Sequence, residues 1–252
     1  MNYLQRYHTE FTDFLGGSNY CSTVLLNLEF EDFNCIKLLI SKLLGIGIVF
    51  GGAILKVPQI MKIVSARSVA GISFASYLLE TICYSISVCY NYRNGMPWTT
   101  YGESIFITVQ NFIVLLLLML YKNNFPGLIL VSAAYLVLSY SLFDPSITDA
   151  WTLVRLQWST VFIAAAAKLP QVYTNFSNKS AGTLSVITVM LQFVGSAARV
   201  FTTLQEVKDT AILSSFLLAT TLNGVIAGQV IWYNYLSASG KKRSVSKRKK
   251  KA

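Results

Sequence analysis

Two lysines interrupt long apolar stretches of this chain, and each stands two residues before a proline. They belong to the segments Lys56-Val-Pro-Gln-Ile60 and Lys168-Leu-Pro-Gln-Val172. A charge deep in an apolar segment is costly, so it is usually paired with another group or has a function. The two segments are therefore the first candidates for a site.

The surroundings of the two lysines differ in one charged residue. Glu80 follows Lys56 at a suitable depth in the next apolar segment, whereas neutral Gln192 takes the equivalent place after Lys168. We predict that Lys56 pairs with Glu80. Lys168 then loses its proton, extends to the membrane interface, as long cationic side chains do, or contacts an anionic group such as a phosphate.

The prolines predict a distortion of both helices. A proline removes one i→i−4 hydrogen bond and clashes with an upstream carbonyl. Pro58 and Pro170 then make either static kinks or hinges, and their repetition favours hinges. The neighbouring Gln59 and Gln171 can hydrogen-bond the freed backbone or a partner helix.

Further polar residues in apolar segments are candidates for lining a cavity. Asn111 and Asn223 occupy equivalent places and either join helices by hydrogen bonds or face a central cavity. Arg199 is a third candidate, near the opposite end of its segment. We expect no enzyme activity, catalytic residues, metal or cofactor, because nucleophile, phosphate-loop and metal-ligand motifs are lacking.

The composition indicates that the elements positioning these residues cross a membrane. The 252 residues are 54% hydrophobic and only 13% charged, too little charge for the surface of a soluble protein. A helix needs about 20 apolar residues to span a bilayer. We predict seven spans, at 41–63, 72–92, 101–121, 126–143, 151–176, 183–204 and 211–236.

An internal repeat organises these spans. A shift of 112 residues pairs Lys56 with Lys168, Pro58 with Pro170 and Asn111 with Asn223. Each copy holds three spans, and a fourth span between them restores the chain direction, so the copies are parallel. The predicted fold is an all-α 3+1+3 membrane protein. Its parts are an N-terminal segment (1–40), the first three-helix repeat (41–121), the linker helix and loop (122–150), the second three-helix repeat (151–236) and the basic tail (237–252).

Loop charges predict the orientation. Basic residues gather in one set of connections and in the tail, which holds eight of the 21 lysines and arginines, and basic loops face the cytosol. We therefore place the N-terminus in the lumen, where Cys21 and Cys35 could pair, and the tail in the cytosol. The basic tail indicates topology anchoring, targeting or lipid contact rather than nucleic-acid binding.

The two Pro-Gln motifs in this 3+1+3 pattern resemble the PQ-loop family, whose fold is similar to that of the SWEET sugar transporters. Three segments resemble its mannose-phosphate-dolichol utilization defect branch: Gly102-Glu-Ser-Ile-Phe106, Ala198-Arg-Val-Phe-Thr-Thr-Leu-Gln-Glu206 and Asn223-Gly-Val-Ile-Ala227. The resemblance implies an endoplasmic reticulum membrane protein needed for dolichol-phosphate-mannose and dolichol-phosphate-glucose to act as sugar donors. N-glycosylation and GPI-anchor assembly would depend on it, and its partners would be membrane lipid and dolichol-phosphate sugars.

Two alternatives remain. The PQ-loop repeat on its own favours a carrier for a small solute such as a sugar or an amino acid. A receptor or assembly factor without transport is the third hypothesis. The last residues, Lys249-Lys250-Lys251-Ala252, resemble a cytosolic dilysine retrieval signal and favour the endoplasmic reticulum.

Overall fold

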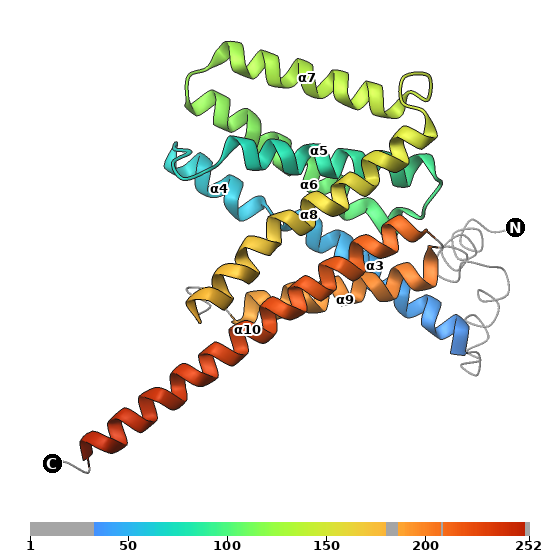
Figure 1. The fold of residues 1–252 in the computed structure, drawn as a ribbon. Coiled ribbons are helices and arrows are strands. Elements are labelled where there is room, and N and C mark those ends of the chain that lie inside the picture. The colour runs from blue at the N-terminus through green and yellow to red at the C-terminus, as the bar shows by residue number, and fades with distance from the viewer. Residues whose placement is uncertain (1–32, 180–185, 208, 250–252) are drawn as a thin grey trace, which may run out of the picture. The chain divides into compact units, whose positions relative to one another are not determined.

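The computed structural model describes residues 33–179, 186–207 and 209–249, with side chains up to residue 233. All described elements are helices (Figure 1): α3 (Phe33–Ile54), α4 (Val57–Ala66), α5 (Phe74–Arg93), α6 (Trp98–Tyr121), α7 (Phe125–Phe143), α8 (Ala150–Asn178), α9 (Val186–Glu206) and α10 (Thr210–Lys249). The predicted N-terminal segment 1–40, which we expected to be a luminal or interfacial cap, falls mostly outside these residues, as does most of the retrieval-like signal. Its last part, residues 33–40, is not a cap but the start of α3.

Every predicted span coincides with helix in the described residues. Five segments are long and apolar enough to cross a membrane: Phe33–Ala66, Trp98–Tyr121, Phe125–Phe143, Val186–Glu206 and Thr210–Tyr233. Helices α5 and α8 fall outside this set because charged and amide side chains interrupt them, among them Glu80, Arg155 and Lys168. The chain is thus a multi-pass helical membrane protein, and seven as the number of spans stays a prediction.

The first predicted span is two helices rather than one kinked helix. Helix α3 ends at Ile54 and α4 begins at Val57, so Pro58 lies in the first turn of α4. A proline is well tolerated there because the N–H groups of a first helical turn have no intrahelical partner. The prediction of a kink at Pro58 was therefore wrong in form: the helix stops and restarts (Figure 1).

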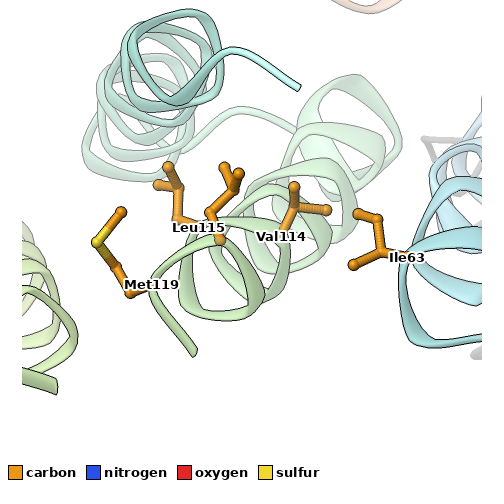
Figure 2. Close-up of a cluster of buried hydrophobic side chains, with 5 residues drawn as sticks. Ile63, Val114, Leu115 and Met119 are labelled. Atoms are coloured by element: carbon orange, nitrogen blue, oxygen red, sulfur yellow. The ribbon is translucent and has the colours of Figure 1, made fainter. Parts of the chain in front are cut away.

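The first repeat packs around α6, which contacts α3, α4, α5 and α7. Small residues on α3 permit a close approach, since a Cβ on Gly52 would lie only 2.7 Å from the Cβ of Glu103. Toward the other end of α6, Ile63 of α4 faces Val114 within a buried apolar cluster (Figure 2). The cluster consists of Ile63, Val114, Leu115, Leu118 and Met119.

Helix α7 buries little of its surface within the chain. Asn124 caps its start by accepting a hydrogen bond from the backbone N–H of Gly127, and Pro126 occupies the first turn. Leu142 is its single buried residue, while Leu130 and Val137 are 69% and 68% exposed. A helix this apolar and this little covered within its own unit is suited to face lipid over most of its circumference.

By its contacts the chain forms two compact units. The first holds residues 1–160 and 201–208, and the second holds residues 161–200 and 209–252. Helices α8 and α9 therefore contribute to both. In the second unit, Val189 of α9 packs with Ile226, Ala227 and Val230 of α10.

The second repeat treats its proline differently from the first. Helix α8 runs unbroken from Ala150 to Asn178 with Pro170 inside it. Here the proline does remove a backbone hydrogen bond from the helix interior, as the sequence predicted. The two repeats thus share a motif but not its local structure.

Candidate functional site

The first Pro-Gln motif carries a neutralised lysine. The Nζ of Lys56 lies 3.0 Å from both carboxylate oxygens of Glu80 on α5. It also lies 5.0 Å from the ring centroid of Tyr77, within the range of a cation–π contact. The side chains of Lys56 and Glu80 are 21% and 34% exposed, so the pair is partly shielded from water. The predicted Lys56–Glu80 pair is present.

The helix break beside Lys56 is held by a residue that the motif does not contain. The side-chain oxygen of Gln110 on α6 accepts the backbone N–H of Lys56 at 2.7 Å. Its amide nitrogen donates to the carbonyls of Gly52 at 2.8 Å and Ala53 at 3.1 Å. Gln110 therefore satisfies the groups that the interruption leaves without helical partners.

Gln59 and Gln171 were predicted to hydrogen-bond the freed backbone or a partner helix, and the described residues show neither bond. In the second repeat, Gln229 of α10 donates to the carbonyl of Val172 at 3.0 Å and accepts from Asn175 at 3.2 Å. In both repeats a glutamine from the third helix, not from the motif, reaches the backbone.

The second motif presents a lysine with a neutral partner. The half-buried Nζ of Lys168 donates to the side-chain oxygen of Asn223 on α10. The amide nitrogen of Asn223 donates in turn to the carbonyl of Gln192 at 3.1 Å and to the Ser196 hydroxyl at 3.0 Å. Among the described residues no carboxylate contacts Lys168, and the amide oxygen of Asn223 is the polar group that its ammonium meets.

Gln192 joins this network through its main chain alone. Its side chain is exposed and does not replace Glu80 as a partner for the lysine. The predicted equivalence of Glu80 and Gln192 therefore ends at their position in the repeat. Ser196, which sequence reasoning left out, supplies the side-chain contact instead.

Among the described residues, Asn223 is the one remaining candidate that is hydrogen-bonded to a motif lysine. Asn223 bonds across helices, whereas its repeat equivalent Asn111 is fully buried and neither atom of its amide has a hydrogen-bond partner among the described residues. Arg199 is 3% exposed on α9. The polar side chains that these helices hold act by hydrogen bonding and by charge.

The connection between α7 and α8 holds two carboxyl groups whose pKa values are lowered by hydrogen bonds. Asp144 accepts hydrogen bonds from the hydroxyl and the backbone N–H of Ser146, which lower the pKa of its carboxyl. The side chain of Thr152 lowers the pKa of Asp149 in the same way. Both carboxylates therefore remain charged at neutral pH and in mildly acidic solution.

Repeated helices that cross a membrane and carry polar residues at equivalent places are an arrangement known from transporters. The sequence profile of the PQ loop repeat matches residues 40–100 and 154–212. The human protein named solute carrier family 66 member 3 is 30% identical over 181 residues, which cover 72% of this chain and 88% of that protein. This chain belongs to the PQ-loop family.

Both matches identify the family and not a branch within it. Neither match is specific to the mannose-phosphate-dolichol utilization defect branch that the sequence segments resemble. No solved structure matches the chain.

Proposed function

We propose that this protein is a membrane carrier for a small solute that bears a carboxylate or phosphate group. The observation that carries the proposal is the contrast between the two lysines. Lys56 has a carboxylate in Glu80, whereas Lys168 has the neutral amide of Asn223. A cation in this setting attracts an anion because moving Lys168 from water leaves its charge poorly compensated.

The partners of Lys168 suit a ligand that is bound and then released. An amide oxygen is a weaker partner for an ammonium group than a carboxylate, so an incoming anion can displace it. Asn223 is then free to donate or accept toward the polar remainder of the solute, and the Ser196 hydroxyl lies within its reach. Membership of the PQ-loop family and the likeness to a solute carrier support transport as the use of this site.

The two prolines have separate roles in this proposal. The break at Pro58 is fixed by the three hydrogen bonds of Gln110 and holds Lys56 in its ion pair. Pro170 lies inside a continuous helix, two residues after the anion-binding lysine. We assign the hinge to Pro170 and a static role to Pro58, so bending of α8 would move Lys168.

A second function shares the same anion site. The segments around Arg199 and Asn223 resemble the dolichol-utilization branch, and Asn223 is the residue that contacts Lys168. The anion would then be the phosphate of a dolichol-phosphate sugar, moved or presented across the endoplasmic reticulum membrane. The acidic α7–α8 loop and the disulfide-bonded Cys35 support a luminal or external N-terminal side, although Cys21 lies outside the described residues.

The test compares Lys168→Gln with Lys122→Gln, which removes an exposed lysine at the end of α6. Purified protein in liposomes is offered radiolabelled monocarboxylates, amino acids and sugar phosphates, and cells lacking the protein are profiled for lipid-linked oligosaccharides. We expect Lys168→Gln to lose at least about tenfold in uptake at unchanged protein level, equivalent to ~1.4 kcal/mol of binding, while Lys122→Gln behaves as the wild type.

The outcomes separate the two functions. Uptake of an organic anion with a normal oligosaccharide profile supports the solute carrier. Truncated, mannose-poor oligosaccharides that Lys168→Gln fails to correct support the dolichol-phosphate role. Full activity of Lys168→Gln in both assays would remove the anion site and leave extension of Lys168 to the interface as the explanation.

A further inference from the structure

A second ion pair lies at the end of the first unit where α3 begins and α9 finishes. The Nζ of Lys42 on α3 is 3.0 Å from a carboxylate oxygen of Glu206, the last residue of α9. The two side chains are 10% and 3% exposed, so this pair is far more buried than Lys56–Glu80. Glu206 lies just beyond the predicted span 183–204, whereas in the structure it is still part of α9.

Hydroxyl groups complete the surroundings of the Glu206 carboxylate. The hydroxyl of Ser41 donates to one oxygen at 2.5 Å, and that of Thr99 on α6 donates to the other at 2.8 Å. The Ser41 hydroxyl also approaches the carbonyl of Thr202 at 3.5 Å. Each carboxylate oxygen therefore has a donor, as burial of a charge demands.

This cluster joins residues that belong to different sequence repeats. Lys42 on α3 and Thr99 on α6 belong to the first repeat, whereas Glu206 at the end of α9 belongs to the second repeat. Lys56–Glu80, in contrast, lies entirely within the first repeat. The Lys42–Glu206 pair thus ties the two sequence repeats together at one end of the helices.

We propose that Lys42 and Glu206 form a latch that closes this end of the protein and separates when the carrier opens there. The inference rests on the proposed carrier function, since alternating access requires the repeats to part at each end in turn. By the predicted orientation, this is the luminal or external end.

A buried ion pair suits a latch better than an apolar seal does. When the pair is closed, Coulomb attraction and the two hydroxyl donors compensate for lost hydration. When it opens, water reaches both charges and restores that hydration, so opening exposes no apolar surface at this point. An apolar seal of the same area would lose its hydrophobic stabilisation on every opening.

The experiment measures opening without any solute, so its failure is distinct from failure of the carrier function. The reporter is Thr203→Cys, a position 2% exposed and one turn before Glu206. Native Cys89, which is fully buried on α5 of the same unit, is the reference for unfolding. Cys83 is changed to alanine. The full chain in lipid nanodiscs is treated with a neutral, water-soluble maleimide, and modification of each cysteine is followed by mass spectrometry.

Three variants place like or exchanged charges in the latch: Lys42→Glu, Glu206→Lys and the double exchange. Like charges in close contact cost several kcal/mol, so we expect each single variant to speed modification at position 203 by at least about tenfold. The double exchange should bring the rate back to within about threefold of the parent. Cys89 should stay protected throughout.

Two results would overturn the latch. Unchanged modification at position 203 in both single variants would show that the pair does not control access. Equal acceleration at position 203 and at Cys89 would show that the pair holds the fold together and that its loss unfolds the unit.

Discussion

Replacing Gln110 by methionine is the sharpest test of how the first repeat holds its helix break. Methionine has nearly the same length and shape, so the change removes hydrogen bonds without opening a large cavity. The Lys56 N–H and the Ala53 carbonyl lose the partner that Gln110 provides, while the Gly52 carbonyl keeps the N–H of Leu55 at 3.3 Å.

The magnitude follows from these two groups. A backbone group left without a partner in a buried place costs about 1–3 kcal/mol. Two such groups, with some relaxation of the short connection, give a loss of about 2–4 kcal/mol in the free energy of unfolding. For a chain of this size the midpoint of thermal unfolding should then fall by about 5–15 °C.

The assay is thermal unfolding of the purified protein in detergent, with Leu222→Met as the matched control. Leu222 occupies the equivalent place in the second repeat, where α8 has no break to satisfy. Leucine and methionine exchange at little cost, so this control should unfold within about 2 °C of the wild type. A midpoint for Gln110→Met equal to that of the control would refute the assigned role of Gln110.

Three further predictions concern the motifs and the orientation. Lys56→Ala leaves Glu80 without its partner, which should lower the free energy of unfolding by about 1–2 kcal/mol for a partly exposed pair and so lower protein abundance. Adding Glu80→Gln should restore part of that abundance on an immunoblot. Equal abundance of the wild type and both variants would contradict the pair. Pro170→Ala should raise the unfolding midpoint by restoring a helical hydrogen bond yet slow transport, whereas unchanged transport at equal expression would remove the hinge. The glycosylation sequon Asn175-Phe-Ser177 should carry no glycan because we place that end of α8 in the cytosol. A glycosidase-sensitive shift in gel mobility that Asn175→Gln abolishes would reverse the predicted orientation.

The helices and one ion pair could be predicted from the sequence because both depend on short-range patterns. Apolar runs of about 20 residues mark the helices, and a lysine in such a run is often paired with an acid, which was found for Lys56 as Glu80. Equivalent positions in the repeat also drew attention to Asn223. These inferences need only residue type, spacing and depth.

The contacts that were missed join residues far apart in the chain. Gln110 lies 54 positions from Lys56, and Glu206 lies 165 positions from Ser41. Their partners are a backbone N–H and hydroxyl groups, which occur all along the chain and leave no compositional signal. A sign was available for Lys42, since it too is a charge in an apolar run, but nothing in its neighbourhood points to Glu206.

The lipid-facing helix α7 carries information of a different kind. It has few protein contacts to set its tilt, so its length must suit the bilayer around it. Its 19 residues span about 28 Å at ~1.5 Å per residue. That is close to the ~27 Å hydrocarbon thickness of the endoplasmic reticulum and short of the ~32–33 Å of the plasma membrane. Hydrophobic matching by this one helix would therefore suit the endoplasmic reticulum location that belongs to the second proposed function.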